Sequence, residues 1–397
     1  MKKIIILGAG FYYINAIKNI KKLGYYVITL DKNPNSPGFE FADEYEAIDI
    51  FDKEAVYNFS KMKNIDGIMA INDFGTRAAF YTSQKLGLIN PSYLSGICGN
   101  DKGIMRDTWN HDRLPQPQYC IFNSVDDIEF IKSRLEFPIV VKPTDAGGAG
   151  RGISVAYNEK DLIESIKHAE PFVKNNRYIA EEFIEGVEVT VDSLVYKGKV
   201  HPLSISDKEK PKSKYFVATS LNFPAKFSKE VIEKIESIVT KATEVLGVSN
   251  GATHTELIVN GNDIKLVEMG IRGGGGHLFN TIIETNTGIN APQELAKILC
   301  DDKPILQKKQ NSGVCYRFFN PTGSGVIKSI TYNEKIINSD FVVDFGITAK
   351  VGDEFKGLVD SMKRVGFVVT KGINRNEAMK NADLVENSIK FEFEDRL

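Results

Sequence analysis

One glycine-rich stretch, FPIVVKPTDAGGAGRGIS at residues 137–154, constrains the fold more than any other part of the chain. Its apolar run at residues 139–141 predicts a short buried strand that ends at Lys142. The turn that follows holds four glycines, Gly147, Gly148, Gly150 and Gly152. Glycine amides approach phosphate oxygens closely, and Lys142 and Arg151 add positive charge. Two interpretations remain at this point, a phosphate cradle and an ordinary surface hairpin, because the spacing fits neither common phosphate-loop pattern.

Composition narrows the class of protein. The chain has 397 residues, which predicts two to four domains, and its 42% hydrophobic content is that of a globular protein. A formal net charge of −2 excludes a global basic field that would collect nucleic acid. The start, MKKIIILGAG, has too short an apolar core for a signal peptide, and no later run reaches the length of a membrane span. The four cysteines form no CxxC pair. We therefore expect a cytoplasmic protein with no nucleic-acid or membrane partner.

The first hundred residues are typical of a Rossmann-like domain. Residues 3–7 predict a strand, Gly8 and Gly10 a turn, and residues 13–23 a helix, followed by a strand at residues 26–30 that ends at Asp31. Tyr13 stands where a dinucleotide fingerprint has its third glycine, so the domain need not bind a dinucleotide. Further βα units are predicted, with strands at 46–49 and 65–71 and a helix at 76–86. Between the strand at 65–71 and the helix at 76–86, the DFG at 73–75 predicts a turn that faces a ligand crevice.

The middle and the end of the chain predict a longer series of elements. The prolines and glycines of residues 90–117 frame a short helix at 102–109 and mark a first domain boundary. The charge run DKEKPKSK at 207–214 predicts a solvated loop. The other expected elements are helices at 159–169, 229–246 and 374–389, and strands at 178–183, 189–196, 199–204, 252–259, 264–269, 313–319, 325–330, 341–344 and 364–370.

Two carboxylates in the segment THTELIVNGNDIKLVEMG lie symmetrically about an NGND hairpin turn. Glu256 and Glu268 are twelve residues apart, so their side chains are expected to meet on one sheet face. Two like charges in that position repel unless a cation lies between them, and Mg²⁺ prefers such oxygen ligands. A solvated sheet face is the alternative for either glutamate alone. The pair is followed by Arg272 and the glycines 273–276. Together they predict a metal and oxyanion site.

Two further features could bind a nucleotide. The strand that ends at Glu181, Glu182 and Ile184 in EEFIEGVE offers backbone groups to an adenine edge, and Glu188 beyond it can accept hydrogen bonds from a ribose. Lys102 and Lys142 are both candidate phosphate ligands, although a solvated side chain is the default for Lys102.

Lys102, the VVKP with its glycine loop, EEFIEGVE and TEL…VEMGIRGGGG follow one another in the order seen in the ATP-grasp superfamily. The chain resembles the carboxylate–amine ligases of that superfamily, most specifically over residues 100–290. The resemblance implies an α/β and α+β multidomain protein. Its parts are a Rossmann-like N-terminal domain (1–95), a linker helix (96–118), the lid (119–190) and catalytic (191–302) subdomains of a two-part ATP-grasp domain, and a small β-rich C-terminal closing domain (303–397).

The resemblance also implies roles for individual residues. Arg272 would hold the reacting carboxyl group, with Lys142 and Glu268 as further catalytic residues. Gly270 stands where many superfamily members carry an asparagine metal ligand, which leaves the number of metal ions open. His254 and His277 are candidate bases, although structural histidines are the commoner case. By the same likeness, ATP would be bound by Lys102, Lys142, Gly147, Gly148, Gly150, Gly152, Glu181, Glu182, Ile184 and Glu188, Mg²⁺ or Mn²⁺ by Glu256 and Glu268, and substrate by Asp73, Gly273, Gly274 and His277.

The implied function is an ATP-dependent carboxylate–amine ligase that forms an amide bond through an acyl phosphate and releases ADP and phosphate. Its partners would be a small carboxylate, an amine and a second copy of the chain in a homodimer. EMGIRGGGGH is most similar to amino-acid and dipeptide ligases, and PTGSGVI resembles the closing domain of biotin carboxylases and purine-pathway members. The alternatives are a purine-pathway ligase similar to phosphoribosylglycinamide synthetase or carboxyaminoimidazole ribonucleotide synthase and, from another class, a nucleotide-binding module or an NAD-dependent oxidoreductase.

Overall fold

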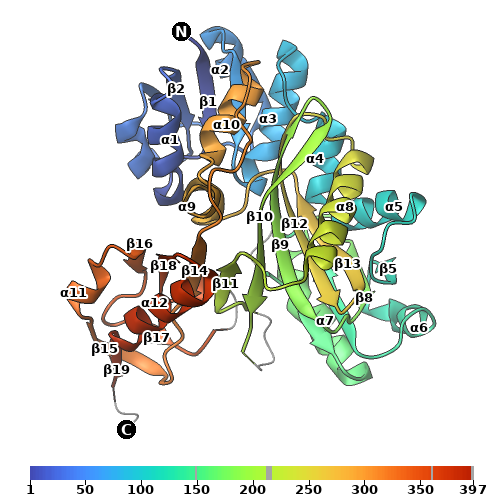
Figure 1. The fold of residues 1–397 in the computed structure, drawn as a ribbon. Helices are drawn as coiled ribbons and strands as arrows, with labels where there is room; N and C mark the ends of the chain where they lie inside the picture. The colour runs from blue at the N-terminus through green and yellow to red at the C-terminus, as the bar shows by residue number, and fades with distance from the viewer. Residues whose placement is uncertain (148–149, 212–216, 359–360, 395–397) are drawn as a thin grey trace.

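The computed structural model describes residues 1–147, 150–211, 217–358 and 361–394. In Figure 1 the N-terminal domain lies at the top, the large central sheet runs down the middle, and the C-terminal strands lie at the lower left. Among these residues no helix has the length and apolar character needed to cross a membrane. Gly148, one of the predicted phosphate-binding glycines, lies outside the described ranges.

The N-terminal domain is built on a parallel four-stranded sheet of order β3-β2-β1-β4. Helix α10 (Ala291–Leu299) comes from far along the chain but packs beside α1 and β4, and its Leu295 and Leu299 share one buried core with Ile4 and Ile6. The Rossmann-like prediction is confirmed. The elements are β1 (Lys3–Leu7), α1 (Ile14–Lys21), β2 (Tyr26–Leu30), β3 (Glu44–Glu46), α2 (Lys53–Lys63), β4 (Gly67–Ala70) and α3 (Asp73–Leu86).

Two predictions in this domain are wrong. The strand expected at 46–49 is β3, which ends at Glu46 where its pairing with β2 stops. The DFG segment is not a turn but the first turn of α3, because the Asn72 side chain accepts a hydrogen bond from the Gly75 amide (2.8 Å) and caps the helix. Glycine is required at position 75, since a Cβ there would lie 2.9 Å from Leu7 Cβ.

The glycine-rich stretch forms the predicted hairpin within a second, antiparallel sheet of order β5-β8-β6-β7. Strand β6 pairs with β7, with Val141 opposite Ser154. Helices α4 (Tyr93–Asn100) and α5 (Lys102–His111) connect this sheet to the N-terminal domain. The remaining elements are β5 (Tyr119–Phe122), α6 (Ile128–Lys132), β6 (Ile139–Pro143), β7 (Ser154–Ala156), α7 (Glu159–Ala169) and β8 (Tyr178–Glu182).

An eight-stranded antiparallel sheet forms the centre of the molecule, in the order β13-β12-β9-β10-β11-β14-β18-β16. The charge run predicted as a loop begins inside it. Strand β10 extends to Glu209 because it keeps pairing with β9 and β11, while residues 212–214 lie outside the described ranges. The first strands are β9 (Val187–Tyr196), β10 (Lys199–Glu209), β11 (Ser220–Phe223), β12 (Gly251–Asn260) and β13 (Asp263–Gly270), with helix α8 (Lys229–Val245).

The C-terminal residues complete this sheet. Strand β14 pairs with β11, so the C-terminal strands continue the central sheet, and a separate three-stranded sheet β17-β15-β19 lies beside them. The expected subdomain boundary at residue 190 falls within β9. The elements are α9 (Ile283–Thr287), β14 (Gly313–Phe318), β15 (Gly325–Thr331), α11 (Glu334–Ile337), β16 (Val342–Ile347), β17 (Glu354–Phe355), β18 (Gly366–Gly372), α12 (Arg375–Asn387) and β19 (Lys390–Phe393).

Candidate functional site

A cavity of about 860 Å³ lies where these parts of the molecule meet. The N-terminal domain contributes Tyr12, Tyr13 and the segment that follows β4, the glycine hairpin contributes its turn, and the central sheet contributes one face. The C-terminal strands close the remaining side. Predicted site residues in its wall are Asp73, Lys102, Gly147, Gly150, Glu256, Glu268, Arg272 and Gly274.

The two predicted metal carboxylates face each other across β12 and β13. Glu256 is the direct partner of Glu268 in the strand register, so the predicted meeting of the two side chains on one face is confirmed. Lys208 approaches Glu256 at 2.8 Å and Lys102 approaches Glu268 at 2.9 Å, so each carboxylate is balanced by its own lysine. About a quarter of each glutamate side chain remains exposed, 26% for Glu256 and 27% for Glu268, and both line the cavity.

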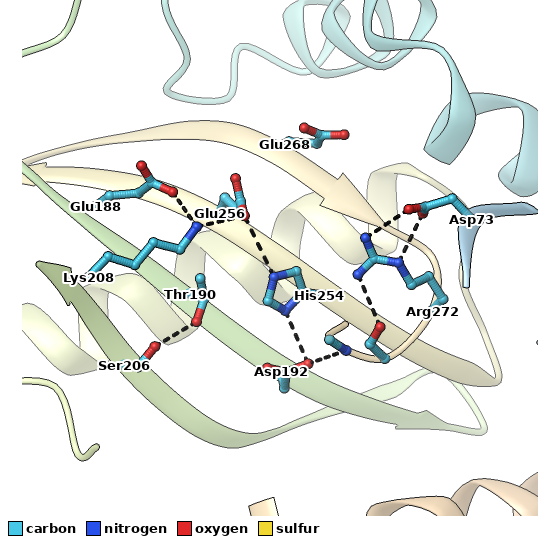
Figure 2. A network of polar contacts seen from close by, with 12 residues as sticks. Asp73, Glu188, Thr190, Asp192, Ser206, Lys208, His254, Glu256, Glu268 and Arg272 are labelled. Atoms are coloured by element: carbon cyan, nitrogen blue, oxygen red, sulfur yellow. Dashed lines mark hydrogen bonds and ion pairs between the residues drawn. The ribbon is translucent and has the colours of Figure 1, made fainter. Parts of the chain in front are cut away.

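A row of charged side chains extends from Glu256 across the same face of the sheet (Figure 2). Lys208 also pairs with Glu188, which Lys210 contacts as well. Burial acts to raise the pKa of Glu188, but Lys208 outweighs it and holds that pKa below its ordinary value. Glu188 lies on β9, and it is an ionised partner of two lysines.

His254 connects Glu256 to a second buried carboxylate. Its Nδ1 lies 3.1 Å from Asp192 and its Nε2 lies 3.7 Å from Glu256. Burial opposes a charge on this ring, but Asp192 together with Glu256 raises the pKa of His254 to about 9. The imidazole is therefore a cation at neutral pH and does not serve as a free base. Asp192 also accepts a hydrogen bond from the Gly274 amide (2.8 Å), which fixes the glycine loop after β13.

Arg272 reaches from that loop to the N-terminal domain. Its Nε and Nη2 donate to the two oxygens of Asp73 at 2.9 and 3.0 Å, a bidentate pair. Burial raises the pKa of Asp73, but Arg272 more than reverses this and holds the pKa below its usual value. Gly270 leaves room for this arginine, because a Cβ at position 270 would lie 3.0 Å from Arg272 Cζ. The guanidinium occupies the space that an asparagine at position 270 would need.

Lys142 and Glu181 form a buried cluster with Arg106. Glu181 lies 2.6 Å from Lys142 and 2.8 Å from Arg106, and all three are less than a tenth exposed. Burial would raise the pKa of Glu181, but the two cations lower it to about 2. Glu181 therefore holds these cations rather than presenting its own carboxylate to a ligand.

The glycine hairpin has the backbone that its sequence requires. Gly147, Gly150 and Gly152 all have positive φ, at 71°, 70° and 68°. Arg151 donates to the carbonyl of Gly147 at 2.9 Å, which braces the turn from within. Gly147 and Gly150 line the cavity.

Several predicted residues lie away from the cavity wall. Gly273 packs under the Phe279 ring, and His277 is buried behind the wall with its Nδ1 3.0 Å from Asp344. The amide of Glu182 donates a hydrogen bond to the carbonyl of Gln118 at 2.9 Å. Among the described residues, the predicted site residues that do not line the cavity are Lys142, Gly152, Glu181, Glu182, Ile184, Glu188, Gly273 and His277.

Four charged residues of the site are not among those predicted from the sequence: Arg106, Asp192, Lys208 and Arg364. The charge run predicts a solvated loop for Lys208, yet the alternation of Ser206 and Lys208 is a strand period that places both on one face of β10. Asp192 lies within an apolar strand, where a carboxylate signals a buried partner. Arg106 and Arg364 carry no such signal in the sequence.

The residues present fit a magnesium ion that also contacts phosphates. Among the described residues no group of three or more metal-ligating side chains gathers in one place. Two opposed carboxylates match the usual protein contribution to Mg²⁺, which keeps water and substrate phosphates as its other ligands. Glu256 and Glu268 are the residues that would hold it.

Sequence comparison agrees with this geometry. The ATP-grasp domain family matches residues 135–280, and the L-amino acid ligase C-terminal domain 2 family matches residues 317–394. A formate-dependent phosphoribosylglycinamide formyltransferase of Sulfurisphaera tokodaii is 24% identical over 280 residues, covering 68% of this chain and 70% of that protein.

Solved structures show the same fold over the whole chain. An L-amino acid ligase from Bacillus licheniformis has a TM-score of 0.84 at 21% identity and covers 100% of this chain and 99% of its own. A phosphoribosylglycinamide synthetase from Anaerococcus prevotii has a TM-score of 0.77 at 24% identity, with 99% and 100% covered. The cofactors of such proteins are ATP and Mg²⁺. The chain therefore contains an ATP-grasp domain followed by a domain similar to the C-terminal domain of L-amino acid ligases.

Proposed function

We propose that this protein joins the carboxylate of one amino acid to the amine of another, with ATP as the energy source. One observation carries the proposal. Residues 317–394 match the L-amino acid ligase C-terminal domain, and some of them line the same cavity as Glu268 and Arg272. The domain that is similar to the C-terminal domain of L-amino acid ligases therefore lines the proposed reaction chamber.

The reaction has two steps. In the first, a carboxylate oxygen attacks the γ-phosphorus of ATP; an O–P bond forms and the bond to ADP breaks. In the second, the amine attacks the acyl carbon; a C–N bond forms, the C–O bond breaks, phosphate leaves with the electron pair and the amine loses a proton. When bound, Mg²⁺ supplies charge neutralisation at the phosphates.

The chain's own residues divide this work. Arg272 holds the reacting carboxylate and then the developing oxyanion, and Asp73 fixes its guanidinium plane. Lys102 lies beside Glu268 and binds phosphate oxygens, while Gly147, Gly150 and Gly152 close over them and exclude water. Lys142 is held by Glu181 beneath the same hairpin. The backbone at Glu182 and Ile184 frames adenine, and Glu188 binds the ribose. His254 orients Glu256, and Gly273, Gly274 and His277 shape the substrate side.

The proposed division of the chain keeps the five parts given above with one change. The lid subdomain ends at residue 186, because β9 begins at Val187 as part of the central sheet. We further propose a cytoplasmic homodimer, for which the elution volume of the purified protein on a calibrated sizing column is the test.

Phosphate release tests the reaction. The purified protein with ATP and Mg²⁺ is expected to release phosphate with amino acids, singly or in pairs, and to form a dipeptide by mass spectrometry. Glu268→Gln and Arg272→Ala are expected to reduce the rate by about 10²-fold or more, as loss of an oxyanion donor does. The matched control is Glu230→Gln, on the exposed surface of α8. Full activity in either site variant contradicts the assignment.

A purine-pathway ligase is the second candidate, favoured by the likeness to the phosphoribosylglycinamide enzymes. Such an enzyme should bind a ribosyl phosphate near the Gly8–Gly10 turn. In this chain the Tyr13 ring lies over Gly8, 2.9 Å from where its Cβ would be, and Asp31 accepts the Ala9 amide at 2.9 Å. A ring and a carboxylate thus occupy the place of a phosphate. Phosphate release with phosphoribosylamine plus glycine, and none with amino acids, would establish this alternative.

A further inference from the structure

A further arginine lines the cavity, on the C-terminal side. Arg364 lies just before β18, and its Nη2 donates to the carbonyl of Ala218 at 3.0 Å. Its Cζ stands 3.3 Å from the centre of the Phe318 ring, so the guanidinium plane rests on an aromatic face. Its Nε is buried and has no hydrogen-bond partner among the described residues.

The charge of Arg364, unlike that of Arg272, is not balanced by a neighbouring carboxylate among the described residues. Arg272 has the carboxylate of Asp73, whereas within the described part of the chain no carboxylate lies within 4 Å of Arg364. Burial lowers the pKa of Arg364 to about 10, which still leaves it charged at neutral pH. A cation held in a largely buried wall without an anion is costly, and a bound anion offsets that cost.

The surface around this arginine is aromatic. Phe318 packs against Tyr316 with ring centres 4.3 Å apart, and Phe367 packs against the same tyrosine at 5.9 Å. Tyr12 reaches into the cavity from the N-terminal domain. His277 supports the wall from behind, with its ring 4.4 Å from Phe367 and 5.2 Å from Tyr12. We call Tyr12, Tyr316, Phe318 and Phe367 the aromatic wall.

Arg364 and Arg272 serve two different positions in one chamber. Tyr12 and Tyr13 are consecutive. Burial raises the pKa of both tyrosines. The positive charge of Arg364 acts to lower the pKa of Tyr12, and that of Arg272 acts to lower the pKa of Tyr13. Arg272 belongs to the end of the cavity that holds Glu268, where the reacting carboxylate is activated. The other end is left for the second substrate.

We propose that Arg364 binds the carboxylate of the amino acid that supplies the amine, and that the aromatic wall receives its apolar or aromatic side chain. This inference rests on the proposed amino-acid ligase function and deepens it. The guanidinium supplies charge-assisted hydrogen bonds to a planar carboxylate, and the rings supply apolar contact area. The amine donor is thus a free α-amino acid, selected for a large apolar side chain.

The test compares an acid with its amide. In the wild-type enzyme with ATP, Mg²⁺ and L-alanine, L-phenylalanine is expected to be a better amine donor than L-phenylalaninamide, which lacks the carboxylate. Arg364→Gln is expected to raise KM for L-phenylalanine by about 10- to 100-fold, the loss typical of a charged hydrogen-bond partner, with KM for ATP unchanged. Arg364→Lys is expected to recover part of this loss. The control is Arg134→Gln, an exposed arginine that also stacks on a phenylalanine, Phe130, at 5.5 Å.

A second variant covers the case in which Arg364→Gln does not fold. Tyr12 is 42% exposed, so Tyr12→Ala should leave the fold intact while raising KM for L-phenylalanine more than for L-alanine as amine donor. If wild type ligates amino acids but Arg364→Gln and Tyr12→Ala keep the same preference for L-phenylalanine over its amide and over L-alanine, the subsite is wrong and the function stands. If wild type releases phosphate only with phosphoribosylamine and glycine, the function itself is wrong.

Discussion

Glu256 and Glu268 face each other across β12 and β13 because the register of the two strands shifts by one residue beside them. Near the turn Leu257 pairs with Leu266, whereas Glu256 pairs with Glu268, so Val267 is the extra residue of a β-bulge. Without the bulge, Val267 would stand opposite Glu256. The shift therefore sets the spacing of the two carboxylates that we assign to Mg²⁺.

Arg106 holds this bulge. Its guanidinium donates to the carbonyl oxygens of Leu266 at 3.1 Å and of Val267 at 2.8 Å, and its Nε donates to Glu181. Strand β13 is the edge strand of the central sheet, so these carbonyls have no neighbouring strand to bind. Arg106 thus connects the lid subdomain to the position of Glu268.

We therefore predict that Arg106 is a positioning residue for the metal carboxylates. Arg106→Lys keeps the charge but loses the forked donor geometry that binds two carbonyls. The Mg²⁺ concentration for half-maximal phosphate release is expected to rise by about tenfold, with a smaller change in KM for the amino acids. The control is Arg113→Lys, an exposed arginine beyond the same helix. An unchanged Mg²⁺ requirement, with the rate lowered equally at all concentrations, would indicate a general loss of stability instead.

The sequence was sufficient for part of this site. The symmetric placement of Glu256 and Glu268 about the NGND turn predicted that they would share one face, which the strands reach through the bulge, and the glycine stretch predicted the β6–β7 hairpin. The sequence around Val267 carries no signal for the bulge, because the bulge depends on Arg106, which reaches the Leu266 and Val267 carbonyls from helix α5. Asp73 and Arg272 are 199 residues apart, and no local period encodes such a pair. The charged neighbours of Lys208 favour a loop over the short strand alternation in the sequence, and pairing with β11 extends β10 across this residue.

Glu181 is expected to make stability depend on acidity. Its pKa is about 2 in the folded protein, against an ordinary value of 4.5. A depressed folded pKa adds stability that is fully present above pH 4.5 and is lost as the pH falls from 4.5 toward 2. Glu181→Gln leaves Lys142 and Arg106 buried without a carboxylate, which is expected to cost roughly 3–5 kcal/mol at pH 7.

Urea unfolding of both proteins at several pH values measures this effect. The gap in unfolding free energy between wild type and Glu181→Gln should narrow as the pH falls below 4.5, because the wild type loses the contribution that the variant never had. Glu164→Gln, on the exposed side of α7 in the same subdomain, should show no such gap at any pH. A gap that stays constant down to pH 3 would show that the ion cluster is not the source.

Gly270 is expected to be needed for the position of Arg272. A methyl group at position 270 would approach Arg272 Cζ to 3.0 Å and force the guanidinium away from its bidentate contact with Asp73. Gly270→Ala is therefore expected to lower kcat by up to about 10²-fold, the effect of a small displacement of a positioning group. Gly10→Ala is the control, because its Cβ would meet Tyr13 no closer than 3.9 Å. If Gly270→Ala keeps the wild-type kcat, a glycine at position 270 is not needed to position Arg272.

The hairpin glycines offer a comparison between two neighbours with the same backbone but different surroundings. Gly150 and Gly152 have φ of 70° and 68°, so alanine is strained at both, by about 1 kcal/mol. A Cβ at Gly150 has open space around it, whereas one at Gly152 would lie 2.9 Å from Pro143 Cγ and 3.1 Å from Ala169 Cα. Because Pro143 is the end of β6 and Ala169 the end of α7, that collision pushes the hairpin away from the helix beneath it. Gly152→Ala should raise KM for ATP about tenfold and lower Tm, while Gly150→Ala should show the smaller strain effect alone. Equal changes in both variants would mean that backbone strain, and not the packing of the hairpin on α7, governs closure over ATP.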